Sequence, residues 1–207
     1  MKTWIYVDGL NLYYGCLKGT SCRRLNPRQL CTLLLPRHRI DRVKYFTARV
    51  FALPTNPDAP TRQDTYLRAL RTLPALEIFF GHFLSHTVTM PLAQPVPGLP
   101  ALVRVIRTDE KGSDVNLASH LLHDGHLNRY QAAVVVSGDS DLFTPVRLVM
   151  EDLKKPVGVI NPQKRTCWVL AKEASFYKHI RPGVLAASQL PPALTDAHGT
   201  FHKPASW

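Results

Sequence analysis

The chain has 207 residues, of which 45% are hydrophobic, and this is enough for one α/β domain with a full core. Its net charge of +11, with an isoelectric point near 9.8, favours a polyanionic partner and puts nucleic acid ahead of a membrane, although basic residues also serve solubility. The N-terminal apolar run stops at Asp8 and no apolar stretch approaches the ~20 residues of a membrane span, so we expect a cytoplasmic protein without a membrane partner.

Predicted strands and helices alternate along the sequence, which is typical of an α/β fold with a mainly parallel sheet. Apolar and β-branched segments predict strands at 3–7, 42–51, 76–83, 132–136, 156–160 and, to close the domain, 176–180. Caps and apolar spacing predict helices at 27–35, 61–73, 113–124, 142–153 and 166–174. Segments 86–90 and 102–108 predict an antiparallel excursion around a loop rich in proline: Pro91, Pro95, Pro97 and Pro100.

The chain changes character after Arg181. We predict a folded domain over residues 1–181 and a Pro-rich C-terminal tail over 182–207, where the prolines forbid a continuous helix. The tail also carries apolar residues that a solvated linker would lack: Leu185, Leu190, Leu194, Phe201 and Trp207. We expect the tail to pack on its own domain, with exchange between two copies in a homodimer as the alternative.

Carboxylates follow two of the predicted strands. Asp8 comes directly after the apolar run 4–7, and Asp139 and Asp141 come just after the apolar run 132–136. In open α/β sheets the functional crevice lies outside the carboxyl ends of the strands, so both groups are expected to point into one crevice. Carboxylates gathered in one cleft repel one another unless a cation joins them, and a divalent metal is the usual solution.

Each acid also has a purely structural explanation. Asp8 with Asn11 suits a turn after a strand. Asp114, in the first turn of a predicted helix with Ser113 as its N-cap, suits the positive end of the helix dipole. In the segment 137–141 a cap requires only one of the two acids, and this makes the segment the most specific feature of the chain.

Polar and basic residues near the acids are candidates for substrate contacts. Ser137 ends a predicted strand, Lys111 stands three residues before Asp114, and Arg107 lies in the antiparallel excursion. Hydroxyl, ammonium and guanidinium groups all donate hydrogen bonds to phosphate oxygens. Further basic residues are candidates for a phosphate-binding rim, although each alone suits a solvated surface: Arg62, Arg68, Arg71, Arg104, Lys164 and Arg165.

The acidic segments together carry a family resemblance. The segments Tyr6-Val7-Asp8-Gly9-Leu10-Asn11, Lys111-Gly112-Ser113-Asp114-Val115 and Val135-Val136-Ser137-Gly138-Asp139-Ser140-Asp141 resemble the NYN domain, a branch of the PIN-like nuclease superfamily, over residues 3–180. The resemblance implies a PIN-like three-layer α/β sandwich and a ribonuclease that depends on Mg²⁺ or Mn²⁺. It also implies that Asp8, Asp114 and Asp139 hold the metal, and that Asn11 and Asp141 support the site.

Two features depart from the family pattern. Many bacterial relatives carry a further acid where this chain has His120, which concerns the outer shell of the metal site. The segment 84–107 is also longer than a minimal family member needs.

We therefore expect an endoribonuclease that cleaves RNA phosphodiester bonds, preferring accessible single strands. Its predicted catalytic residues are Asp8, Asn11, Asp114, Asp139 and Asp141. One alternative is a non-catalytic RNA-binding NYN module. Another is a haloacid-dehalogenase-type phosphatase with Asp8 as nucleophile, but that chemistry normally needs a second acid two residues later, where this chain has Leu10.

The cysteines allow one further alternative. Cys16, Cys22, Cys31 and His38 are a conceivable zinc ligand set, but their spacings fit no standard zinc pattern. No cysteine pair has the C-x-x-C spacing, so we expect free thiols.

Overall fold

A seven-stranded sheet forms the centre of the protein. The computed structural model describes residues 1–52, 54–94, 98 and 100–205. The sheet has the order β4-β3-β2-β1-β5-β6-β7, and every pair is parallel except β3 with β4. Its strands are β1 (Lys2–Asp8), β2 (Arg39–Ala48), β3 (Leu76–Pro91), β4 (Leu102–Lys111), β5 (Ala132–Val136), β6 (Val157–Asn161) and β7 (Phe176–His179). The expected α/β fold with a mainly parallel sheet and one antiparallel excursion is confirmed.

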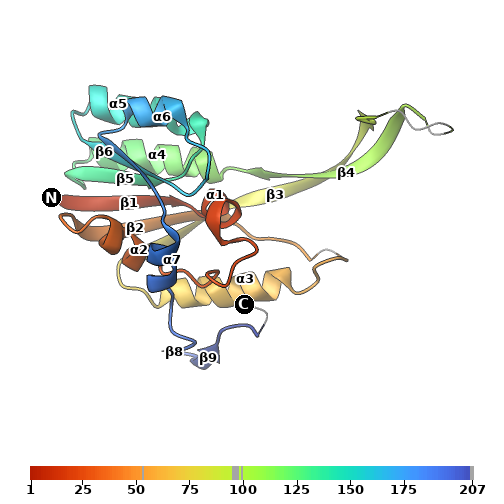
Figure 1. Cartoon of the computed structure of the whole chain (residues 1–207), viewed down its shortest axis with the longest axis horizontal. Coiled ribbons are helices and arrows are strands. Elements are labelled where there is room, and N and C mark those ends of the chain that lie inside the picture. The colour runs from red at the N-terminus through yellow and green to blue at the C-terminus, as the bar shows by residue number, and fades with distance from the viewer. Residues whose placement is uncertain (53, 95–97, 99, 206–207) are drawn as a thin grey trace.

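Helices cover both faces of the sheet and produce three layers (Figure 1). One face packs against α2 (Pro27–Leu34), α3 (Ala59–Arg71) and α7 (Pro182–Ala187), and the other against α4 (Ser113–His126), α5 (Phe143–Glu151) and α6 (Trp168–Glu173). Alternate β1 residues divide between the two cores: Ile5 and Val7 point to the first, and Trp4 and Tyr6 to the second. Because the central strands are buried on both faces, they read as continuous apolar runs in the sequence.

Short helical turns follow two of the strands. The turn α1 (Gly9–Leu12) and the π-helical η1 (Tyr13–Leu17) come directly after β1, and the 3₁₀ turn η2 (Ser140–Leu142) follows β5. The helix expected over 142–153 is therefore divided into η2 and α5, with Pro145 in the first turn of α5, where proline is tolerated. No helix in the described part of the chain is long and apolar enough to cross a membrane.

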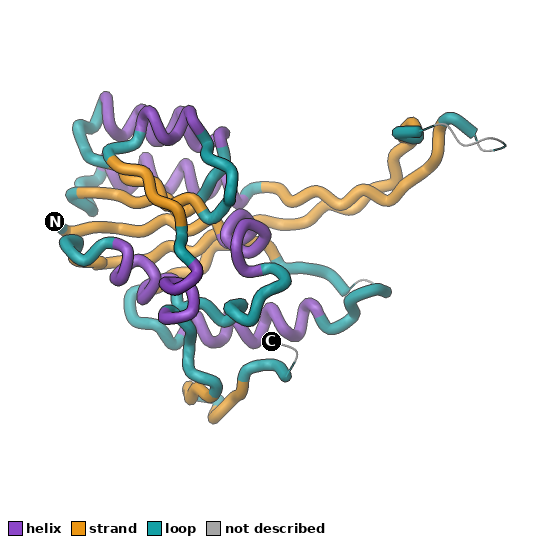
Figure 2. The backbone as a smooth tube through the Cα atoms, in the orientation of Figure 1, coloured by secondary structure: helices purple, strands orange, loops and turns teal. Residues whose placement is uncertain are grey.

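The antiparallel excursion is longer than the sequence predicted. The separate strands expected at 76–83 and 86–90 form one strand, β3, which pairs with β4 from His82↔Lys111 to Pro91↔Leu102. The far halves of β3 and β4 leave the body of the protein as a two-stranded arm (Figures 1 and 2). Pro95 and Pro97 of the predicted loop lie outside the described residues.

The C-terminal tail packs on its own chain. It contains α7, which begins at Pro182, and the hairpin of β8 (Ala193–Asp196) and β9 (Gly199–His202). The Arg68 guanidinium on α3 donates two hydrogen bonds of 2.7 Å to the Asp196 carboxylate. The tail also buries apolar side chains in the core on the α2 and α3 face: Leu185, Leu190 and Phe201. The contacts agree with the expectation that the tail packs on its own domain, and they give Arg68 a structural partner instead of a free place on a basic rim.

Candidate active site

The ends of two adjacent parallel strands bring Asp8 and Ser137 together. β1 and β5 pair in the register Val7↔Val136, so the residues that follow these two, Asp8 and Ser137, reach the same edge of the sheet. The Ser137 hydroxyl donates to Asp8 Oδ2 at 2.9 Å, and the Asn11 backbone N–H donates to Asp8 Oδ1 at 2.9 Å. Asp8 is only 4% exposed, so both of its carboxylate oxygens are held in a buried position.

The turn after β5 depends on Gly138. Its N–H donates to Asn11 Oδ1 at 3.0 Å, which joins this turn to α1. A Cβ atom at position 138 would stand 2.3 Å from Asn161 Oδ1 on β6, so a side chain there would push the turn away from the sheet edge. The Gln163 side-chain amide also donates to Asn11 Oδ1, at 3.3 Å. Asn161 and Gln163 were not predicted, because only the folded structure brings the end of β6 beside β5.

Asp139 and Asp141 stand at the start of η2. The Asp139 N–H donates to Ser137 Oγ at 3.1 Å, and Asp139 Oδ1 accepts from the Asp141 N–H at 3.0 Å. Asp139 therefore caps the turn with one carboxylate oxygen. Asp141 is exposed, and its carboxylate has no hydrogen-bond donor among the described residues, so it is free to contact a ligand.

Asp114 is the second residue of α4 and joins the other acids from a different element. Gly112, with a φ of 94°, turns the chain from β4 into this helix. The expectation that Ser113 is the N-cap is wrong, because Ser113 lies inside the helix and its buried hydroxyl has no partner among the described residues. The Glu110 carboxylate, from the end of β4, accepts from the Ser113 N–H at 3.0 Å instead. Glu110 thus adds an acid that the sequence reading did not include.

The pKa values show that these carboxylates share one electrostatic environment. Burial is the first cause that raises the pKa of Asp8 to about 7, and the charges of Asp114 and Asp139 contribute further. Burial is also the first cause that raises the pKa of Asp114 to about 6. The remaining rise at Asp114 comes, in decreasing order, from the charges of Asp139, Glu110 and Asp141. The acids predicted from distant parts of the sequence therefore lie close enough to influence one another's ionisation.

The predicted metal ligands do not converge into a closed cage. No group of three or more His, Cys, Asp or Glu side chains is arranged to hold a single metal ion, within the residues that the structure describes. This finding gives the alternative zinc set no support, and its cysteines are free thiols: Cys16, Cys22 and Cys31. The ligand set of Asp8, Asp114 and Asp139 stays a prediction, and its members are hard oxygen donors of the kind that Mg²⁺ and Mn²⁺ prefer.

The predicted substrate contacts lie at different distances from the acids. Ser137 is inside the cluster, and Lys111, exposed at the end of β4, is next to Glu110. Arg107 is four residues farther out, about 13 Å along the strand, and donates to Asp109 at 2.9 Å. Lys111 is therefore better placed than Arg107 to meet a phosphate at the carboxylates.

His120 belongs to a different cluster. Its Nδ1 lies 3.1 Å from Lys44 Nζ, and its ring centre lies 4.2 Å from that of Phe79. Lys44 in turn pairs with Asp124, and both side chains are buried. Burial and then the Lys44 charge lower the pKa of His120, and the acids that oppose this shift most are Asp124 and Glu77. His120 thus packs α4 against β2 and β3.

Comparisons with known proteins agree with this arrangement at the level of the family and the fold. The NYN domain family model matches residues 2–180. Over 236 residues the chain is 30% identical to 6-hydroxy-3-succinoylpyridine 3-monooxygenase HspA of Pseudomonas putida (strain DSM 28022 / S16). This match covers 100% of the present chain and 75% of HspA. The crystal structure of VPA0982, a protein of unknown function from Vibrio parahaemolyticus RIMD 2210633, has a TM-score of 0.57 at 20% identity, covering 87% of this chain and 93% of that chain. The last likeness shows a shared fold.

Proposed function

The chain belongs to the NYN domain family, and from that premise we propose that it is a divalent-metal-dependent endoribonuclease. NYN domains are typically nucleases. One observation carries the proposal for this chain: carboxylates that repel one another are gathered at the sheet edge of a protein whose net charge is +11.

The two signs of charge suit a nuclease better than a simple binding module. A protein that only binds polyanions gains nothing from acids that repel phosphates as well as one another. A nuclease uses basic residues to hold the nucleic-acid backbone and acids to hold a metal. Asp8 and Asp114, whose pKa values are raised to about 7 and about 6, are carboxylates that a bound cation would return to the ionised form.

The oxygen donors fit Mg²⁺ or Mn²⁺. Mg²⁺ keeps several of its waters and usually takes one or two carboxylates, so it needs no closed cage of three side chains. We assign to Asp8, Asp114 and Asp139 the role of holding the ion, directly or through water. When bound, the ion would neutralise charge that develops on the scissile phosphate and lower the pKa of water.

The chain's own residues supply the remaining parts of the hydrolysis. Asp141 is the candidate general base, because it is exposed beside the cluster and its carboxylate has no partner among the described residues. It accepts a proton from the attacking water as the water oxygen bonds to phosphorus, while the bond from phosphorus to the leaving ribose oxygen breaks and that oxygen takes a proton from solvent. Ser137 links Asp8 to the Asp139 turn, and Asn11 links the same turn to α1, so both act as positioning residues.

The proposed substrate is single-stranded RNA. Lys111, Lys164 and Arg165 are exposed on the elements around the carboxylates, and their charges suit the phosphate backbone without reading base sequence. Arg107 is a more distant contact, because Asp109 already engages its guanidinium. Binding should therefore weaken steeply as salt is raised.

The test is incubation of the purified protein with end-labelled single-stranded RNA in Mg²⁺, in Mn²⁺ and in EDTA, with duplex RNA as the control. The proposal expects internal cleavage of the single strand in either metal and none in EDTA. Binding without cleavage in every metal would favour a non-catalytic RNA-binding module. Cleavage that is equal in EDTA would contradict a metal-dependent mechanism.

The name of the HspA relative supports a second candidate, which is oxygenation of a hydroxypyridine. The support is the 30% identity over the whole chain. Monooxygenation needs dioxygen and a source of electrons, and this sequence contains no G-x-G-x-x-G dinucleotide fingerprint. The nuclease therefore remains the first proposal. Incubation with 6-hydroxy-3-succinoylpyridine, oxygen and a reduced nicotinamide tests the second, because consumption of the pyridine would favour it.

A further inference from the structure

Two aromatic side chains are exposed on elements that flank the carboxylates. Tyr14 is 60% exposed and lies in η1, which continues directly from the α1 turn that carries Asn11. Trp168 is 70% exposed and is the first residue of α6. Exposed Tyr and Trp rings are enriched at interfaces, where their apolar faces meet a partner. Two open rings beside one candidate site therefore suggest a ligand with flat faces of its own.

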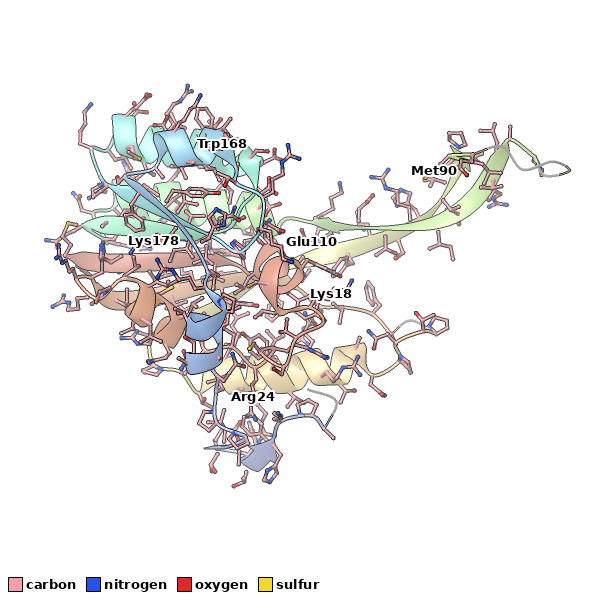
Figure 3. The ribbon with its side chains drawn as sticks, in the orientation of Figure 1. Lys18, Arg24, Met90, Glu110, Trp168 and Lys178 are labelled. Carbon is pink, nitrogen blue, oxygen red and sulfur yellow. The ribbon has the colours of Figure 1, made fainter. Side chains whose placement is uncertain are left out.

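Short contacts tie the elements of both rings to the carboxylate cluster. The Gln163 side chain reaches Asn11, which joins the loop before α6 to α1. A Cβ atom on Gly15 would lie 3.0 Å from the Pro162 backbone, so η1 packs directly on this loop. α6 also contacts η2, the turn that carries Asp141. In the view of Figure 3, Glu110 lies between Trp168 on one side and Lys18, the neighbour of Tyr14, on the other.

Cations accompany both rings. The Lys18 ammonium lies 4.8 Å from the centre of the Tyr14 ring. Lys164 and Arg165 are exposed in the loop that leads to Trp168, and neither side chain forms an ion pair with another described residue. The charges are therefore available to phosphates, whereas Arg107 on the arm is already paired with Asp109. Rings interleaved with free cations are the usual chemistry of proteins that bind single-stranded nucleic acid.

We propose that Tyr14 and Trp168 are stacking platforms for unpaired bases of RNA, one on each side of the scissile phosphate. Bases in a duplex are already stacked on their neighbours, so platforms of this kind select single strands. The flexible Lys18 side chain moves from the Tyr14 ring to a backbone phosphate when a base arrives. The two rings determine substrate choice and position and take no part in the bond-breaking step. The inference rests on the proposed function for its substrate class.

Tryptophan fluorescence tests the inference without requiring cleavage. The protein is titrated in EDTA with an unstructured RNA of about 12 nucleotides, a length in the range of known single-strand sites. Trp4 is buried, and comparison with Trp168→Phe isolates the signal of Trp168 from that of the other tryptophans. The proposal expects the RNA to quench the wild-type emission and to leave Trp168→Phe unquenched.

Affinity measurements with matched variants complete the test. Trp168→Leu and Tyr14→Leu keep apolar bulk but lose the flat ring, so each should weaken binding of the single strand about tenfold, and Trp168→Phe should weaken it less. Leu127→Ala removes exposed apolar surface just after α4, at the opposite edge of the sheet, and should bind as the wild type does. Wild-type affinity in Trp168→Leu, an unquenched Trp168 or no measurable binding would each overturn the proposal. The binding assay runs in EDTA and does not depend on cleavage. A protein that never cleaves RNA but shows the quenching would therefore refute the proposed nuclease activity and still support the stacking role of the two rings.

Discussion

Replacing Asp8 with asparagine should make the metal-free protein more stable at pH 8. Burial and neighbouring acids raise the pKa of Asp8 in the folded protein from 3.8 to about 7. Between these two values the folded state binds a proton that the unfolded state has lost, so stability falls by about 1.4 kcal/mol for each unit of pH. The contribution of Asp8 to the free energy of unfolding is fully present below pH 3.8 and is lost as the pH rises through about 7. The whole loss amounts to about 4 kcal/mol.

The asparagine variant avoids that loss but weakens one contact. The Ser137 hydroxyl donates to Asp8 Oδ2 and the Asn11 N–H donates to Asp8 Oδ1, but an asparagine has only one oxygen and its amide nitrogen accepts no hydrogen bond. Loss of one of these hydrogen bonds costs about 1 kcal/mol. The net gain of Asp8→Asn is then about 3 kcal/mol at pH 8 and under about 1 kcal/mol at pH 5.

Urea unfolding in EDTA at pH 5 and pH 8 measures both values. Asp152→Asn is the matched control, because it makes the same chemical change at an exposed position after α5 and should leave stability nearly unchanged at either pH. The difference in free energy of unfolding between Asp8→Asn and the wild type should increase from pH 5 to pH 8, and a constant difference would refute the reasoning. A variant less stable than the wild type at pH 8 would do so as well.

Further predictions concern the metal, the turn and the tail. Mn²⁺ at about a hundred times its dissociation constant should raise the free energy of unfolding by about 2.7 kcal/mol in the wild type and far less in Asp114→Asn, as urea titrations can show. Apparent Mn²⁺ affinity in calorimetry should fall at least about tenfold from pH 8 to pH 5, because protons compete for carboxylates with pKa values of about 7 and about 6. Gly138→Ala should cost about 2 kcal/mol and reduce cleavage, because its Cβ would meet Asn161 Oδ1 at 2.3 Å, and wild-type stability would count against this account of the turn. Truncation after Arg181 should lower the urea midpoint and leave the protomer count in light scattering unchanged, whereas a halved count would indicate a dimer held by the tail.

Local sequence patterns were enough to predict the central part of the fold. The apolar run 132–136 forms β5 with the expected bounds, because a strand buried on both faces is apolar throughout. The sequence placed Asp8 and Asp139 just after two predicted strands, and the structure shows that these strands are neighbours, paired in the register Val7↔Val136. That step worked because the carboxyl ends of parallel strands share an edge, whichever residues lie between them.

Residues whose role depends on long-range packing were not predictable in the same way. Glu110 reaches the cluster because β4 runs without interruption to Lys111 beside β3, and the proline-rich stretch concealed the length of that pair. Gln163 meets Asn11 across a separation of 152 residues, and no local pattern marks such a contact. The sequence could place Trp168 on a helix, but only burial in the folded chain distinguishes an exposed ring from a core residue.

Cleavage of single-stranded RNA in Mn²⁺ by Asp139→Asn, measured beside Asp152→Asn, tests the nuclease assignment most directly. Asp139 and Asp152 are both aspartates that follow a secondary-structure element, but only Asp139 lies in the carboxylate cluster. The account predicts that Asp139→Asn loses cleavage by at least about a thousandfold, still binds the RNA in EDTA, and unfolds at no lower urea concentration than the wild type. It predicts wild-type cleavage by Asp152→Asn. Full cleavage by Asp139→Asn, after a mock purification has excluded contaminating nuclease, would contradict the assignment.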